Sequence, residues 1–308
     1  MRNRPSHYHL VVDADFRLRE AMVAFPGREP VEVRVDQLPL RDLSGFLEGV
    51  KKLSPTAHLR HSDGLLYRVN RFAVRDGTAI VAVPTYPPPE SWSELAGSLP
   101  IQNLSHQIRN RPGLVLIMGD MGAGKTTVAG TYLVDSLKQD GGVALAWQDP
   151  IETDIEGKHG PGRCHQIEIE TSQYKQAAID AMRGRSKYVF FGEARDPQTY
   201  LSALNVAMSG PQMLITSHGD NLINGLMKYA SNAHMLDSQA YNLLAASLTA
   251  AIHLRLRDAG RGPELLVETL LVTAAQADPI RVAIRSRNVE GLVTQLRQQA
   301  AQRVRGVA

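Results

Sequence analysis

Cysteine, aromatic side chains and long apolar runs are all scarce in this sequence, and each shortage excludes a class of protein. The one cysteine, Cys164, has no second cysteine with which to form an internal disulfide, which excludes a disulfide-stapled secreted domain. No run of about 18 or more apolar residues occurs, so we expect no membrane-spanning helix. The N-terminus does not have the charged, apolar and small-residue order of a secretory signal, so a cytosolic location is expected.

Charge of one sign is not concentrated in any part of the chain. The 34 basic and 31 acidic residues are interspersed, and the net charge is +3. A basic balance attracts nucleic acid or anionic lipid, but aromatic residues make up only 6% of the chain and no basic stripe alternates with them. Charge therefore gives weak support for nucleic-acid binding, and an anionic nucleotide explains the balance equally well.

The 308 residues, 43% of them hydrophobic, are enough for two domains. Short apolar runs that alternate with polar residues predict strands over 8–12, 31–35, 65–69 and 79–83. A helical pattern over 38–53 interrupts them, so we predict a small α+β domain over residues 1–84. Residues 85–100 contain three consecutive prolines, which predict a stiff, extended linker.

Beyond the linker, short and fully apolar runs alternate with stretches of helix length. This pattern is typical of buried parallel strands connected by helices. We therefore predict a doubly wound α/β domain with a mainly parallel sheet over residues 101–308, ending in two more strands and C-terminal helices. The expected strands are 114–118, 143–147, 188–191 and 213–216, and the expected helices are 126–138, 173–183, 197–208 and 221–229.

One stretch satisfies the phosphate-loop pattern G-x-x-x-x-G-K-[ST], directly after an apolar strand and directly before a helix. Its glycines let the backbone wrap closely around phosphate, with N–H groups directed at the anion. Lys125 is predicted to reach the β- and γ-phosphates, and Thr126 to give its hydroxyl to Mg²⁺. A glycine-rich turn without a ligand is the plainer alternative. The predicted nucleotide-binding residues of the loop are Gly119, Met121, Gly122, Ala123, Gly124, Lys125, Thr126 and Thr127.

A second acidic position follows the apolar run 188–191. Glu193 comes at the end of this expected strand, where a doubly wound sheet presents groups to its ligand crevice. The carboxylate is then placed to orient or deprotonate water. The alternative is a structural ion pair with Arg195.

Four motifs, in this order, resemble those of the secretion ATPase superfamily, and most nearly those of the type IV pilus retraction ATPases. Segments 119–127, 148–152, 192–196 and 216–218 match the family's Walker A motif, Asp box, Walker B motif and His box. Further segments are similar to the family as well: 33–36, 67–72, 247–252 and 283–286. The resemblance implies a RecA-like P-loop NTPase core that binds ATP and Mg²⁺, preceded by a PAS-like N-terminal domain.

The resemblance also implies roles for single residues. Glu193 matches the catalytic carboxylate, Glu152 the carboxylate that helps to place Mg²⁺ and water, and His218 the sensor of the γ-phosphate. Arg68 and Arg75 match arginines that reach the nucleotide from the N-terminal domain of the same or a neighbouring subunit. Plainer alternatives are a turn cap at Glu152, an ordinary strand-end histidine at His218, and two solvated arginines.

Two positions depart from the family pattern. Gln148 stands where the Asp box commonly begins with Glu, and Pro211 stands where pilus retraction ATPases often have a second histidine. These departures leave two subgroup interpretations open: a divergent pilus motor, or a relative from a conjugation or secretion apparatus.

The function implied by the resemblance is that of a hexameric motor ATPase. It would couple ATP hydrolysis to type IV pilus retraction or dynamics, or to a related secretion or conjugation machine, in the cytoplasm at the inner face of the bacterial cytoplasmic membrane. The implied partners are the other subunits of a homohexamer and an inner-membrane platform protein, with membrane contact only through partners and no specific nucleic acid. A DNA-handling RecA-like ATPase and a nucleotide-dependent scaffold that does not hydrolyse ATP are the alternatives.

Overall fold

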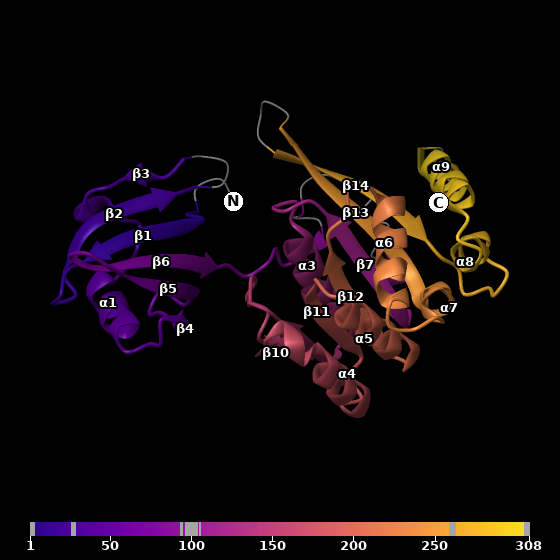
Figure 1. Ribbon diagram of the computed structural model, residues 1–308, viewed down its shortest axis with the longest axis horizontal. Coiled ribbons are helices and arrows are strands. Elements are labelled where there is room, and N and C mark those ends of the chain that lie inside the picture. Colours follow the sequence, from indigo (N-terminus) through magenta and orange to yellow (C-terminus); the bar gives the residue numbers. More distant parts are fainter. Residues whose placement is uncertain are drawn as a thin grey trace. The chain divides into compact units, whose positions relative to one another are not determined.

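The computed structural model describes residues 4–25, 29–92, 95, 104, 106–258 and 263–304. The chain divides into two compact units, residues 1–87 and 88–308 (Figure 1). Residues 93–94 and 96–100 of the predicted linker lie outside the described residues, so the linker stays a prediction. None of the described helices combines the length and apolar character needed to cross a bilayer.

The described part of the first unit contains an antiparallel six-stranded sheet in the order β3-β2-β1-β6-β5-β4. Helix α1 packs one buried side, Phe46 and Val50, into the same core as Tyr8 of β1 and Tyr67 of β5. The bounds are β1 (His7–Val12), β2 (Leu18–Ala24), β3 (Val31–Glu32), α1 (Leu43–Lys51), β4 (Thr56–Arg60), β5 (Leu66–Val74) and β6 (Gly77–Thr85).

Two expectations for this unit were wrong in detail, and two strands were not predicted. The helix expected over 38–53 begins only at Leu43, because the side chain of Asp42 accepts a hydrogen bond from the Gly45 N–H and caps the helix there. The strand expected over 31–35 ends at Glu32, and a 3-10 turn follows over Val35–Gln37. Strands β2 and β4 were not predicted, because their burial does not alternate regularly along the chain.

In the second unit, the described residues form an eight-stranded sheet in the order β14-β13-β7-β12-β11-β8-β10-β9. Its six inner strands run parallel, whereas β9 and β14 pair antiparallel at the two edges. The strands are β7 (Gly113–Gly119), β8 (Gly142–Gln148), β9 (Gly157–His159), β10 (Gly162–Glu168), β11 (Tyr188–Ala194), β12 (Gln212–Ser217), β13 (Leu248–Asp258) and β14 (Pro263–Leu271).

Helices cover both faces of this sheet (Figure 1). Every residue of β7 is buried: Leu114 and Leu116 contribute to one core cluster, while Val115 and Ile117 contribute to the other. A strand that is apolar on both sides belongs in the centre of a doubly wound sheet, as the sequence predicts. The helices are α3 (Lys125–Asp140), α4 (Tyr174–Arg183), α5 (Pro197–Met208), α6 (Leu222–His234), α7 (Ala240–Ser247), α8 (Pro279–Arg285) and α9 (Val289–Val304).

The strands β7, β12, β11 and β8 lie side by side, and their carboxyl ends meet at one edge of the sheet. In open α/β sheets the ligand crevice lies at this edge. The strand order therefore gathers the phosphate loop after β7, the acidic segments after β8 and along β11, and the histidine after β12.

Candidate active site

The phosphate loop connects β7 to α3 and is shaped by glycines. Gly122 and Gly124 have φ angles of 75° and 86°, which L side chains rarely adopt, and a Cβ at either position would project into open space. Gly124 is also the N-cap of α3, which has no side-chain cap. The free N–H groups and the positive end of the helix dipole therefore face a cradle that suits an anion. The loop fits the phosphates of a nucleotide.

Lys125 is the buried cation of this loop, with only 7% of its surface exposed. Its Nζ donates to the carbonyl oxygens of Gly119 and Asp120, at 3.0 Å each. Burial lowers the pKa of Lys125, and the Glu193 carboxylate opposes this shift. The ammonium group is thus anchored by two backbone carbonyls at the rim of the cradle, within reach of bound phosphate.

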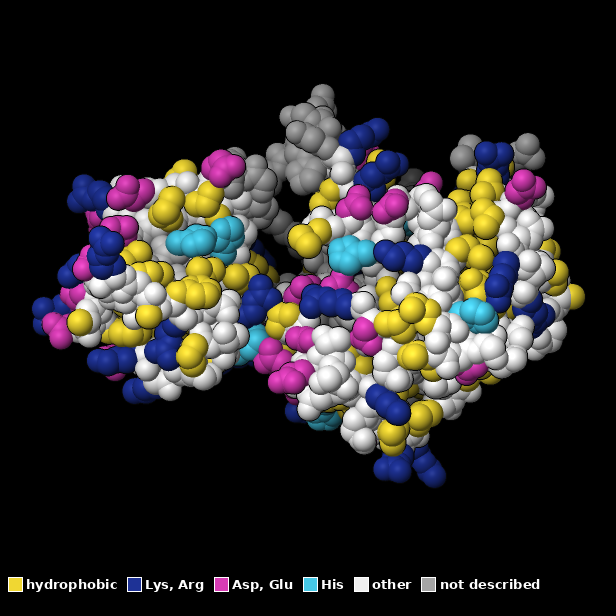
Figure 2. All heavy atoms as spheres, viewed as in Figure 1, with side chains coloured by type: hydrophobic (Ala, Val, Ile, Leu, Met, Phe, Trp, Pro, Cys, Tyr) yellow, Lys and Arg dark blue, Asp and Glu magenta, His cyan; other side chains and the backbone are white. Residues whose placement is uncertain are grey.

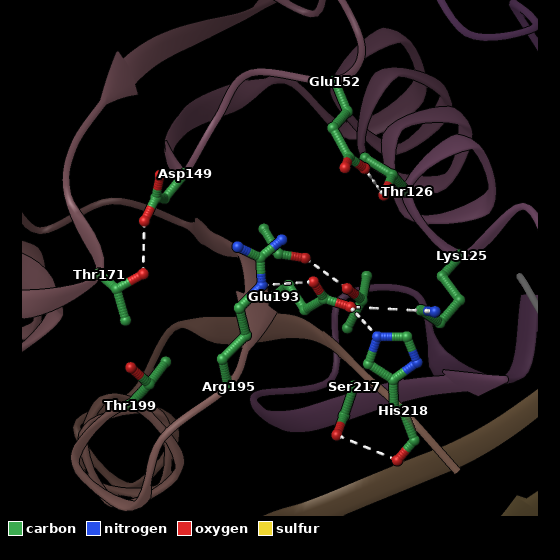
Figure 3. A network of polar contacts seen from close by, with 12 residues as sticks. Lys125, Thr126, Asp149, Glu152, Thr171, Glu193, Arg195, Thr199, Ser217 and His218 are labelled. Carbon is green, nitrogen blue, oxygen red and sulfur yellow. Dashed lines mark hydrogen bonds and ion pairs between the residues drawn. The ribbon is translucent and has the colours of Figure 1, made fainter. Parts of the chain in front are cut away.

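Thr126 and Glu152 meet beside the loop. The Thr126 hydroxyl donates to Oε2 of Glu152 over 2.7 Å, which joins the first turn of α3 to the segment after β8 (Figure 3). The described residues contain no cluster of three or more His, Cys, Asp or Glu that could hold a metal ion. Mg²⁺ usually takes few protein ligands and completes its shell with phosphate oxygens and water, so one hydroxyl beside one carboxylate suits it.

Glu193 lies on a β-bulge of β11. The register with β12 shifts between Phe191 and Ala194, so an extra residue on β11 redirects this part of the strand. Oε2 of Glu193 accepts from Nε of Arg195 at 2.7 Å, and this hydrogen bond raises the pKa of Arg195. Oε1 lies 3.1 Å from Nε2 of His218.

Oε1 of Glu193 also lies 3.9 Å from Nζ of Lys125. Figure 3 shows the carboxylate pointing between the side chains of Lys125, His218 and Arg195. Glu193 is only 18% exposed, whereas His218 and Arg195 are about half-exposed. The ion pair with Arg195 does form, but Lys125 and His218, from two other segments, also lie against the same carboxylate.

The predicted site residues divide into three groups: those at the carboxyl edge of the sheet, the remaining residues of the loop, and two arginines of the first unit. Lys125, Thr126, Glu152, Glu193 and His218 come together at the carboxyl edge of the sheet.

The remaining residues of the loop surround this group. Met121 is 87% exposed, whereas Ala123 is buried and its N–H donates to the Asp120 carbonyl at 3.2 Å. The Thr127 carbonyl accepts from Thr131.

The two predicted arginines belong to the other unit. Arg68 is half-buried on β5, and Arg75 is exposed in the turn that follows that strand. Their contact with a nucleotide stays a prediction.

Two further polar groups support the site and were not predicted. Tyr200 and Ser217 share a buried hydrogen bond of 3.0 Å directly behind His218. Gln166 on β10 bonds to the segment that carries Glu152. The polar composition of β10 concealed this strand from a search for apolar runs, and no signal in the sequence pointed to Gln166.

A family model described as "Type II/IV secretion system protein" matches residues 98–300. The chain is similar to the type IV pilus ATPase PilU of Pseudomonas aeruginosa, with 26% identity over 55% of this chain and 45% of that protein. It therefore spans less than half the length of this curated relative.

Two solved structures share the fold over almost the whole chain. The pilus retraction motor PilT with bound ADP has a TM-score of 0.72 at 22% identity, covering 96% of this chain and 86% of PilT. The ATPase DotB of Legionella pneumophila has a TM-score of 0.68 at 16% identity, covering 97% of this chain and 84% of DotB. These likenesses confirm the predicted fold class, a RecA-like α/β core preceded by a smaller N-terminal domain.

Proposed function

Since the chain belongs to the type II/IV secretion system protein family, as its four motifs predicted, we propose that it is a motor ATPase of a type IV pilus or a related secretion machine. The observation that carries this proposal is the convergence on the Glu193 carboxylate. His218 lies 3.1 Å from Oε1 and Lys125 lies 3.9 Å from it, at the edge of the sheet where the phosphate loop ends. A phosphate-holding lysine and a carboxylate this close serve one nucleotide.

The residues of the loop would bind and orient the nucleotide. The N–H groups of the loop and of the first turn of α3 surround the phosphates, and the Lys125 ammonium compensates their negative charge. Thr126 would hold Mg²⁺ beside the loop, where the ion would supply positive charge against the phosphates. Glu152 accepts the hydrogen bond of Thr126 and so fixes the orientation of its hydroxyl.

Glu193 and His218 would act at the γ-phosphate. The carboxylate accepts a hydrogen bond from the attacking water and orients it for in-line displacement. His218, held on the carboxyl end of β12, is placed to exchange its contact with Glu193 for one with the γ-phosphate. Loss of that phosphate on hydrolysis would restore the contact, which gives the site a means of sensing the nucleotide state.

The rest of the proposed function concerns assembly. PilT is a pilus retraction motor with bound ADP, and we propose nucleotide binding and motor action for this chain as well. We propose a homohexamer in which Arg68 or Arg75 of a neighbouring copy completes each site, since always-charged guanidinium groups suit the developing phosphate charge. An inner-membrane platform protein in the bacterial cytoplasmic membrane would receive the motion.

The test is a steady-state ATPase assay on the purified chain with Mg²⁺, with and without single- and double-stranded DNA. Hydrolysis that DNA does not change supports the motor ATPase. Strong stimulation by DNA would favour a DNA-handling ATPase instead. Tight ATP binding without turnover would favour a nucleotide-dependent scaffold.

Over the visible face of each unit, Lys and Arg side chains lie scattered among Asp and Glu (Figure 2), so that face offers no continuous basic track for DNA.

A further inference from the structure

The side-chain amide of Gln166 ties the segment 149–156 to strand β10. Its Oε1 accepts from the N–H of Ile155 at 3.2 Å, and its Nε2 donates to the carbonyl of Thr153 at 2.7 Å. The same Nε2 also donates to Oε1 of Gln148, the last residue of β8. One side chain therefore satisfies three partners, and these partners span both ends of the connection between β8 and β9.

Only an amide of this length suits the position. The three bonds require one acceptor and two donors on the same planar group, which Asn and Gln side chains alone provide. A carboxylate at 166 would set an oxygen against the carbonyl of Thr153. An apolar side chain of the same size would leave the N–H of Ile155, which is fully buried, without this acceptor.

This amide group is connected to both carboxylates of the site through neighbouring residues. Glu152, which accepts from Thr126 at 2.7 Å, directly precedes Thr153 in the chain. On the other side, the buried Gln148 side chain packs against Gly192: a Cβ at 192 would lie 3.1 Å from Cγ of Gln148. Gly192 directly precedes Glu193.

We propose that Gln166, together with Gln148, is a positioning residue that holds Glu152 beside Thr126 and at a set distance from Glu193. The proposal rests on the proposed ATPase function, because only there does the placement of Glu152 serve bound Mg²⁺ and water. Gln166 contacts neither carboxylate. It acts through the backbone at 153 and 155, as an outer support does for the ligands of a metal site.

The first test compares Gln166→Ala with Gln176→Ala. Gln176 is an exposed glutamine on α4 whose amide bonds to Asp180 in the same helix, so the control makes the same chemical change away from the site. The ATPase rate is measured at saturating ATP over a range of Mg²⁺ concentrations. Gln166→Ala is expected to lower kcat or raise the half-saturating Mg²⁺ concentration by about 10- to 100-fold, the usual cost of losing an outer support. An unchanged Mg²⁺ profile and kcat would overturn the proposal.

A double-mutant cycle separates positioning from a general structural role. If Gln166 acts through Glu152, then Gln166→Ala causes no further loss of kcat in a Glu152→Gln background. Losses that multiply in full would show that Gln166 acts elsewhere. Where Gln166→Ala fails to fold, Gln166→Met keeps the volume of the side chain and removes the same hydrogen bonds.

Hydrogen exchange tests the hydrogen bond between Gln166 and Ile155 without reference to activity. The N–H of Ile155 is expected to exchange faster in Gln166→Ala than in the unaltered chain or in Gln176→Ala, because its acceptor is gone. Unchanged protection would overturn the proposal. If the unaltered chain hydrolyses no ATP, the proposed function is wrong, while the exchange rates still decide whether Gln166 holds the segment.

Discussion

Replacing Glu193 by Gln removes one negative charge at the convergence point of the site and keeps the size of the side chain. The amide retains an oxygen that accepts from Arg195, but it no longer attracts His218 or Lys125, which lie 3.1 Å and 3.9 Å from Oε1. If the carboxylate orients or activates water, turnover falls by about 10²- to 10⁴-fold. This loss corresponds to about 2.7 to 5.4 kcal/mol in the activation barrier.

The effect on stability is expected to be much smaller. Arg195 and His218 are 47% and 44% exposed, so their contacts with Glu193 are screened by water. Partly exposed pairs of this kind contribute about 0 to 1 kcal/mol each to the free energy of unfolding. The two contacts together contribute at most about 2 kcal/mol. Their loss lowers the melting temperature by no more than about 4–8 °C in a domain of this length.

Three measurements on one preparation distinguish a catalytic from a structural role of Glu193: the steady-state ATPase rate, the ATP affinity by isothermal titration, and the melting temperature. Glu264→Gln is the matched control, because Glu264 also pairs with an arginine, Arg257, but on exposed parts of β13 and β14. We expect Glu193→Gln to bind ATP and to lose turnover, while Glu264→Gln keeps both. Near-normal turnover in a well-folded Glu193→Gln protein would refute the assignment. A lowered melting temperature with a normal rate would show that the ion pair with Arg195 is structural.

Three further outcomes are expected. Lys125→Ala abolishes tight ATP binding in isothermal titration with Mg²⁺, because it removes the charge beside the β- and γ-phosphates; undiminished affinity would contradict the phosphate loop. The chain forms hexamers that a slowly hydrolysed ATP analogue stabilises, as mass photometry would detect, whereas a fully active monomer would disprove shared sites. Cys164 is fully buried, and burial raises the pKa of its thiol to about 12, so mass spectrometry should find it unmodified by iodoacetamide at pH 8 until the protein unfolds. Rapid labelling of the folded protein would contradict the buried position of this thiol. Because the thiol ionises first in the unfolded chain, the contribution of Cys164 to the free energy of unfolding falls as the pH rises from about 9 towards 12.

The strands at the centre of the second unit were predictable from the sequence alone. Strands β7, β8, β11 and β12 each contain a short apolar run, because helices cover both faces of the sheet there. Strands β9 and β10, at one end of the sheet, were not, since they carry exposed polar residues and do not stand out from a loop. Local capping decided where α1 begins, and burial alternation alone did not indicate it.

The candidate site was also only partly predictable from the sequence. Lys125 and Thr126 were assigned from the sequence because the phosphate loop is one contiguous segment whose local conformation depends on its own glycines. The family motifs also named Glu152, Glu193 and His218, but not their mutual contacts. These residues come from separate segments, and only the strand order and the bulge in β11 bring Glu193 to within 3.1 Å of His218.

The support from Gln166 was decided entirely by tertiary structure. Its partners lie 11 to 18 residues away along the chain, and they meet it because β10 pairs parallel to β8 in one register. Hydrophobic periodicity records which face of an element is buried, but it carries no information on which strand lies next to which. Hydrogen bonds between strands depend on that order, so the sequence determined which residues carry the chemistry, and the fold decided which groups hold them in place.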